Sequence, residues 1–113
     1  MSASLRMAVS NITPTEYSTW LARGDKAVLL DVRDDWEHRL AHVAGALHIP
    51  MDQIPERLAE LDRDATIVVM CHTGGRSLAI ANFLQQKGFS AVLNLKGGID
   101  AWAIEVETSL PRY

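Results

Sequence analysis

Short apolar runs that alternate with helix-forming segments limit the possible folds of this chain more than any other feature. Residues 27–32, 66–70 and 91–95 are mostly apolar and of strand length, which is typical of strands buried on both faces of a parallel sheet. Segments with helix start and stop signals separate these runs. The alternation therefore predicts an α/β domain of three layers, in which helices cover both faces of a central, mostly parallel sheet.

The expected helices begin and end at recognisable residues. Thr13 can cap the first helix, Pro14 suits its first position, and Glu16 completes a capping box. Gly24 is a natural end for that helix. We expect helices at residues 14–23, 36–40, 55–61, 77–87 and 99–103, and one further short strand at residues 46–50.

The length and charge of the chain exclude several classes of protein. Its 113 residues suit one domain, which we expect to span residues 1–113 with terminal segments at residues 1–10 and 105–113. Its 14 acidic and 11 basic residues give a net charge of −3, which offers no electrostatic footprint for nucleic acid or an anionic membrane. The apolar runs are too short to span a bilayer, and residues 1–10 lack the apolar core of a signal peptide. We therefore expect a cytoplasmic protein.

A single cysteine, Cys71, excludes an internal disulfide and a zinc site built from several thiolates. His38, His42 and His48 have neither cysteine partners nor a fixed pair spacing, so we expect no metal site. In the expected cytoplasmic setting the thiol of Cys71 stays reduced. Any special role of this thiol therefore depends on its immediate surroundings.

Cys71 directly follows the clearest predicted strand, residues 66–70. In parallel α/β sheets, ligands bind beyond the carboxyl ends of the strands, so Cys71 lies where chemistry is expected. The loop after it holds Gly74 and Gly75, which permit left-handed backbone angles and a close approach to a ligand. Successive amide groups in such a turn can converge on an anion. The loop thus predicts a cradle of backbone N–H groups around the sulfur.

Positive charge at the same loop favours the thiolate form of Cys71. A helix is expected to begin near Arg76 and Ser77, so the positive end of this helix and the guanidinium both act on the loop. Such settings lower a cysteine pKa from about 8.5 by one or more units, and the thiolate is the nucleophile. We therefore predict that Cys71 and Arg76 are catalytic. The neighbouring loop residues are predicted to contact the substrate: His72, Thr73, Gly74, Gly75 and Ser77.

Less specialised roles are open for several of these residues. A lone cysteine after a buried strand is more often a small core residue. Arg76 can also be a structural partner of Asp31 or Glu37, and both of its roles can hold together. Asp31 ends a strand beside the site and could orient the loop, whereas Arg33 and Glu37 are spaced for an ion pair if their segment is helical. We predict supporting roles for Asp31, Arg33 and Glu37.

Four ordered motifs resemble those of the rhodanese family of sulfurtransferases, and together they cover nearly the whole chain. They are Asp31-Val32-Arg33, then Glu37 with residues 41–46 and 49–50, then residues 71–77, and finally residues 95–102. One departure is visible, because the family usually has glycine where this chain has Ala41. Alanine is tolerated there only if the backbone does not need a positive φ angle. The resemblance implies the rhodanese fold, with sulfur transfer as the activity.

The resemblance also implies a specific chemistry for Cys71. Its thiolate would attack the outer sulfur of a donor such as thiosulfate and become a persulfide. An acceptor nucleophile would then take the sulfur, whether cyanide, a thiol or a dedicated protein. The loop amides would hold the terminal sulfur, and Arg76 would stabilise negative charge on the donor and the intermediate. This double displacement requires no metal or organic cofactor.

Two other functions stay open at this point. One is a sulfur-carrying or regulatory module, which would hold a persulfide for a partner but turn over poorly with small donors. The other is a phosphatase or arsenate reductase on the same fold, and such enzymes place five residues between the cysteine and the arginine. Four residues separate Cys71 from Arg76, so the shorter loop favours sulfur. A phosphatase also needs a general acid, for which Asp34 or Asp35 could be nominated.

Overall fold

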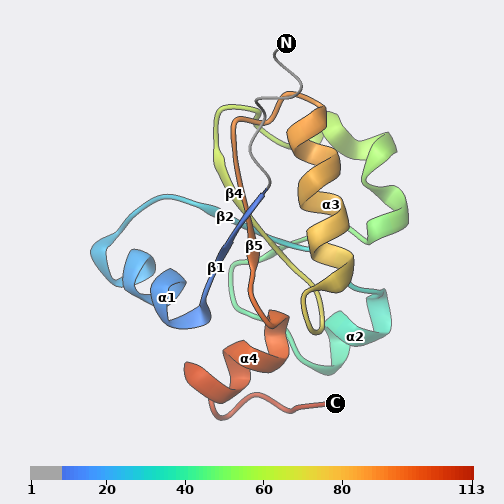
Figure 1. Cartoon of the computed structure of the whole chain (residues 1–113). Helices are drawn as coiled ribbons and strands as arrows, with labels where there is room; N and C mark the ends of the chain where they lie inside the picture. The colour runs from blue at the N-terminus through green and yellow to red at the C-terminus, as the bar shows by residue number, and fades with distance from the viewer. Residues whose placement is uncertain (1–8) are drawn as a thin grey trace.

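The computed structural model describes residues 9–113, and within them five parallel strands form one sheet (Figure 1). The strands are β1 (Ser10–Ile12), β2 (Val28–Asp31), β3 (Leu47–His48), β4 (Thr66–Met70) and β5 (Ala91–Leu95). They are ordered β1-β5-β4-β2-β3, so β4 lies in the middle. Four consecutive residues of β4 are fully buried, which explains why this strand is apolar on both sides: Ile67, Val68, Val69 and Met70.

Helix α3 (Gly75–Gln86) covers one face of the sheet, together with two 3₁₀ helices, η2 (Met51–Gln53) and η3 (Pro55–Glu60). Ile80 and Leu84 of α3 belong to the same buried cluster as Leu30, Ile67 and Val69 of the sheet. Full burial of such a side chain contributes about 1.5–3 kcal/mol, so this face fixes α3 firmly over the middle strands. The helix that follows Cys71 is therefore anchored along its length.

Helices α1 (Pro14–Arg23) and α4 (Gly98–Glu105) cover the opposite face (Figure 1). Tyr17 of α1 and Trp102 of α4 pack with ring centroids 5.9 Å apart, over Leu29, Val68 and Met70 of the sheet. Helices thus cover both faces, which confirms the predicted α/β architecture with a parallel sheet. Short helix α2 (Asp35–Leu40) follows β2 and lies near the carboxyl ends of the strands.

Several boundaries differ from the sequence prediction. The helix expected at residues 55–61 is a 3₁₀ helix over Pro55–Glu60, with a kink at Arg57. Helix α3 begins at Gly75, two residues earlier than expected. Strand β1 lies partly in the expected terminal segment 1–10, whose residues 1–8 are outside the described part of the chain. This strand has only one buried residue, Ile12, so its sequence carries little apolar signal.

The chain after α4 packs back onto the domain rather than extending away from it. Leu110 and Tyr113 are partly buried against the cluster beneath α1 and α4. Arg112 pairs with Asp100 of α4 at 2.8 Å. Among the helices of residues 9–113, none has the length and apolar character needed to cross a bilayer.

Candidate active site

The loop after β4 curls around the sulfur of Cys71. Gly74 has a left-handed backbone with a φ of 113°, and its N–H donates to the Cys71 Sγ at 3.1 Å. Gly75 is instead the first residue of α3 and has no positive φ, so the left-handed role expected for Gly75 is wrong. A Cβ at Gly75 would meet no protein atom within 4 Å. Gly74 therefore bends the loop, whereas Gly75 leaves open space at the start of the helix.

The N-terminus of α4 binds two backbone carbonyl groups of this loop. The amides of Ile99 and Asp100 donate to the carbonyl oxygens of Cys71 (2.9 Å) and His72 (3.1 Å). A Cβ at Gly98 would overlap both of these carbonyl groups, so only glycine permits such a close approach. Because the carbonyls are engaged by α4, the loop backbone is fixed with an N–H group directed at the sulfur.

Ser77 and Asn94 form a buried polar pair beside the sulfur. The Ser77 Oγ lies 3.3 Å from the Cys71 Sγ and 2.5 Å from the Asn94 Oδ1. A hydroxyl has one proton, so Ser77 donates to one of these acceptors at a time. The Asn94 amide in turn donates to Asn11 Oδ1 (3.0 Å) and to the Gly74 carbonyl (3.3 Å). Asn94 thus connects strand β1 and the loop to the residue that faces the thiol.

Hydrogen bonding outweighs burial in setting the charge of Cys71. The residue is only 1% exposed, and burial, the largest single effect, raises the pKa of its thiol. Hydrogen bonds from the Ser77 hydroxyl and from the amides of Ser77, Gly74 and Thr73 together bring that pKa below its ordinary value. The sulfur is therefore enclosed by donors and not by apolar groups alone, which is the arrangement that a nucleophilic thiolate needs.

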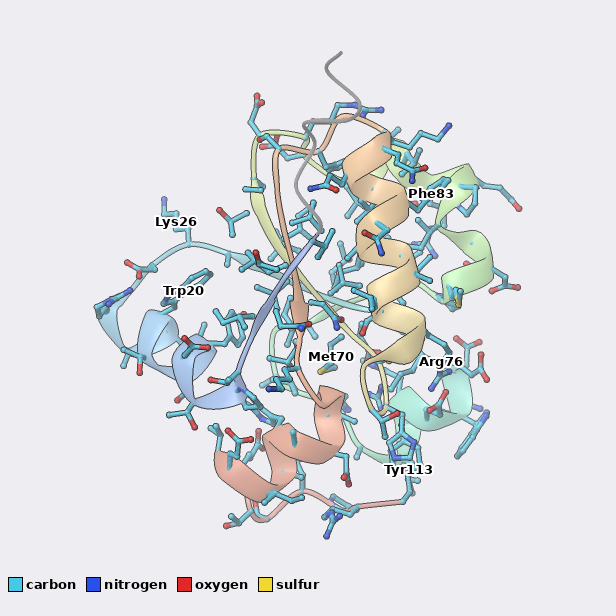
Figure 2. The ribbon with its side chains drawn as sticks, in the orientation of Figure 1. Trp20, Lys26, Met70, Arg76, Phe83 and Tyr113 are labelled. Atoms are coloured by element: carbon cyan, nitrogen blue, oxygen red, sulfur yellow. The ribbon has the colours of Figure 1, made fainter. Side chains whose placement is uncertain are left out.

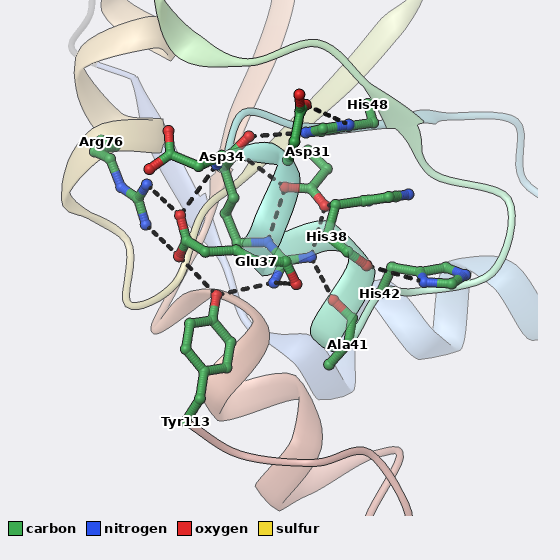
Figure 3. Close-up of polar contacts among 11 residues, drawn as sticks. Asp31, Asp34, Glu37, His38, Ala41, His42, His48, Arg76 and Tyr113 are labelled. Carbon is green, nitrogen blue, oxygen red and sulfur yellow. Dashed lines mark hydrogen bonds and ion pairs between the residues drawn. The ribbon is translucent and has the colours of Figure 1, made fainter.

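Arg76 forms a two-pronged ion pair with Glu37 (Figure 3). Its Nη1 and Nη2 donate to the Glu37 Oε1 and Oε2 at 2.7 and 2.8 Å, and the Asp34 N–H donates to Oε1 at 3.0 Å. The hydrogen bonds from Arg76 are the main reason that the pKa of Glu37 falls to about 2. Of the two partners left open by the sequence, Arg76 thus takes Glu37. The guanidinium also keeps an electrostatic interaction with Cys71 and remains 35% exposed.

Arg76, labelled in Figure 2, also borders a cleft of about 620 Å³ that is lined by residues of η2, η3 and α3 and by Asp34. Ile80 and Phe83 of α3 supply part of its apolar wall, and Asp34 and Asp52 supply its acidic groups. Cys71 does not line this cleft.

Asp31 and Arg33 form a second, fully buried ion pair. The Arg33 Nε and Nη2 donate to the two Asp31 oxygens at 2.9 and 2.7 Å, and His38 Nδ1 lies 3.1 Å from one of them. Arg33 donates to the backbone carbonyl of Glu37, so the side-chain pair that a helical segment would have allowed does not form. Helix α2 starts at Asp35, after Arg33, which removes the helical spacing behind that expectation. The contacts found for Asp31 are to Arg33 and His38 and not to the active loop.

Ala41 ends α2 with an extended backbone, φ −158° and ψ 136°. This position does not need a positive φ, so alanine replaces the usual glycine without strain. The Ala41 carbonyl accepts a 2.7 Å hydrogen bond from Arg33, and its side chain is buried. The one departure from the family pattern is thereby explained.

Of the remaining candidate residues, some lie at the active loop and others lie away from it. His72 is half-buried at the loop, with its ring against Tyr113, whereas Thr73 is exposed. His38 stacks between His42 and His48, and the Nδ1 of His42 lies 3.2 Å from the His38 carbonyl oxygen. Within residues 9–113, no group of His, Cys, Asp and Glu side chains could hold a metal ion.

Two residues of the site were missed by sequence reasoning. Asn94 is the one polar residue in the apolar run of β5, and that interruption was a usable signal. Tyr113 lies in a segment without periodicity, and no local pattern indicates that its side chain returns to the loop. Trp36 is 55% exposed and meets the Tyr113 ring edge-on.

Comparison with known proteins agrees with this geometry. The sequence model of the rhodanese-like domain matches residues 13–105, which is most of the chain. The chain belongs to the rhodanese family. A protein named simply "Sulfurtransferase" from Allochromatium vinosum is 38% identical over 95 residues, which cover 84% of this chain and 89% of that protein. The match to the family includes β4, the active loop and the Arg76–Glu37 pair, whereas Tyr113 lies beyond it.

Other relatives place the same domain in different settings. The probable adenylyltransferase/sulfurtransferase MoeZ of Mycobacterium tuberculosis is 42% identical over 106 residues, but the match covers 92% of this chain and only 27% of MoeZ. The chain thus spans about a quarter of that relative. The crystal structure of a rhodanese-like domain protein from Staphylococcus aureus superposes with a TM-score of 0.81 at 28% identity, covering 93% of this chain and 99% of that one. The rhodanese fold is shown by sequence and by structure.

Proposed function

We propose that this chain, acting as a single rhodanese-like domain, transfers sulfane sulfur through a persulfide on Cys71. One observation carries the proposal: at the carboxyl end of β4, the Gly74 N–H and the Ser77 hydroxyl both lie within hydrogen-bond distance of the Cys71 sulfur. Such donors stabilise negative charge on the thiolate and on the terminal sulfur of a persulfide. The family membership supports the same chemistry.

In the first step, the Cys71 thiolate attacks the outer sulfur of thiosulfate. A bond forms between the two sulfurs, and the sulfur–sulfur bond of the donor breaks with its electron pair leaving on sulfite. In the second step an acceptor nucleophile attacks the terminal sulfur, and the electron pair of the persulfide bond returns to Cys71 as thiolate. Cyanide, a small thiol or a protein thiol can serve as the acceptor. No metal or organic cofactor enters either step.

In this proposal Arg76 is catalytic, because its charge stabilises the anionic donor and the intermediate. Its guanidinium is partly exposed and interacts with both Cys71 and Glu37, so an incoming anion would share its charge with Glu37. Asp31, Arg33 and Glu37 support this arrangement, and we expect residues 72–75 and Ser77 to contact the substrate. A reducing compartment such as the cytoplasm would keep the single thiol available between turnovers.

The test is the intact mass of the protein after incubation with thiosulfate. We expect a gain of about 32 Da, one sulfur atom on the activated thiol. The added mass should disappear on treatment with cyanide, and Cys71→Ser should never acquire it. Absence of the gain with thiosulfate and with organic persulfides would contradict the proposal.

A sulfur-carrying module is the second candidate, and one observation favours it. The protein named putative sulfur carrier protein YrkF from Bacillus subtilis is 35% identical over 79 residues, which cover 70% of this chain and 43% of that protein. A carrier would show the same mass gain as an enzyme but little turnover of thiosulfate with cyanide. Steady-state turnover with thiosulfate, mercaptopyruvate and organic persulfides separates the two candidates and ranks the donors.

A further inference from the structure

Tyr113 reaches back from residues 106–113 to the active loop (Figure 2). Its ring lies 4.0 Å from the ring of His72, the residue after the nucleophile, and the two planes are 7° from parallel. Trp36 of α2 meets the same Tyr113 ring edge-on, with centroids 5.7 Å apart. These two ring contacts hold the Tyr113 side chain in one place between α2 and the loop.

The phenol oxygen of Tyr113 connects the two ion pairs of the site (Figure 3). It accepts a hydrogen bond from Arg33 Nη1 at 2.9 Å and donates its own proton to Glu37 Oε2 at 2.8 Å. Burial, and to a smaller degree Glu37, raise the pKa of Tyr113 to about 12, although Arg33 opposes them. The phenol therefore keeps its proton at neutral pH and remains a donor to Glu37.

This hydrogen bond affects how much positive charge Arg76 can offer. Glu37 Oε2 accepts from both Tyr113 and Arg76, so each donor takes part of the carboxylate charge. Arg33, bonded to the far side of the phenol oxygen, strengthens that O–H as a donor. When the phenol donates to Glu37, the carboxylate neutralises less of the positive charge of Arg76. More of that positive charge then acts on an anion near Cys71.

We propose that Tyr113 is a positioning residue: through Glu37 it keeps the orientation and charge of Arg76 available to an anionic sulfur donor. The catalytic role of Tyr113 rests on the proposed sulfur transfer. Its effect on the charge around Cys71 is independent of turnover and can be measured separately.

The experiment compares two alkylating reagents that differ mainly in charge. Iodoacetate is an anion and iodoacetamide is neutral, and both react with the Cys71 thiolate. We expect Tyr113→Phe, which keeps the ring and removes only the hydroxyl, to lower the ratio of the iodoacetate to the iodoacetamide rate constant by about threefold. Tyr17→Phe is the matched control, because Tyr17 of α1 packs in the core and makes no ring contact with the loop. The ratio of rate constants in Tyr17→Phe should equal that of the wild type.

A double-mutant cycle shows whether the effect passes through Arg76. Arg76→Ala should lower the ratio at least as much, and adding Tyr113→Phe to Arg76→Ala should change it no further. With thiosulfate as substrate, Tyr113→Phe should raise KM about threefold and leave kcat within about twofold. Far-UV circular dichroism confirms that each variant is folded.

Two results would overturn the proposal for Tyr113. One is a wild-type ratio in Tyr113→Phe, and the other is a fall that persists at full size in the Arg76→Ala background. If wild-type protein gains no sulfur from any donor, the proposed function fails, yet the alkylation ratios still decide the role of Tyr113. If sulfur transfer is found and the ratios do not change, only the role of Tyr113 is wrong.

Discussion

Replacing Ser77 by alanine tests whether its hydroxyl stabilises the Cys71 thiolate. The single proton of Ser77 has two acceptors, the sulfur at 3.3 Å and the Asn94 carbonyl oxygen at 2.5 Å. A hydrogen bond to a charged group contributes about 1.5–3 kcal/mol, and the long, shared bond to the sulfur belongs at the lower end of that range. Since about 1.4 kcal/mol corresponds to one pKa unit, Ser77→Ala should raise the Cys71 pKa by about one unit.

The assay is the rate of iodoacetamide alkylation as a function of pH. Its midpoint reports the pKa of Cys71, and it should move to higher pH in Ser77→Ala. Ser18→Ala, a half-buried serine on α1, serves as the control and should leave the midpoint unchanged. Urea unfolding supplies a second reading, because the buried Asn94 oxygen loses its donor, at a cost of about 1–3 kcal/mol.

One combination of results would refute the reasoning about the sulfur. If Ser77→Ala loses stability but keeps the wild-type alkylation midpoint, the hydroxyl proton stays with Asn94 in both charge states of Cys71. Ser77 would then be a structural residue, and the backbone amides alone would lower the pKa of the thiol.

Two further predictions concern stability. The pKa of Glu37 is lowered on folding from 4.5 to about 2, so its contribution to stability is present above pH 4.5 and is lost as the pH falls towards 2. The difference in urea midpoint between wild type and Glu37→Gln should therefore shrink over that interval; a difference independent of pH would contradict the assignment of this pKa. Gly74→Ala should cost about 1–2 kcal/mol because of its left-handed backbone, whereas Gly75→Ala should be as stable as wild type or slightly more so. Thermal unfolding compares the pair, and equal losses at both positions would show that the backbone at Gly74 is not the cause.

Local signals in the sequence were enough to predict the central strands and the start of the first helix. The β4 and β5 ranges were predicted as found, and the capping box of Thr13 and Glu16 is confirmed. These features depend on neighbours in the chain, such as a run of β-branched residues or a hydroxyl three residues before a carboxylate. The position of Cys71 at the end of β4 followed from the same local pattern.

Contacts between residues that are far apart in the sequence could not be predicted from such local signals. The side chain of Tyr113 meets Glu37 and Arg33, which are more than seventy positions away in the sequence. The side-chain pair between Arg33 and Glu37 that a helical segment would have allowed does not form, because the Glu37 carboxylate pairs with Arg76 and Arg33 pairs with Asp31. Which acceptor a buried guanidinium takes depends on the packed fold and not on spacing alone.

The attachment of the nucleophile loop to Gly98, Ile99 and Asp100 has a consequence for biosynthesis. While a ribosome is still translating the region before these residues, Cys71 has already been made, but the segment that turns its carbonyl group aside has not. The loop backbone therefore takes its fixed form only after residues 98–100 have been made and α4 has docked onto the Cys71 and His72 carbonyls.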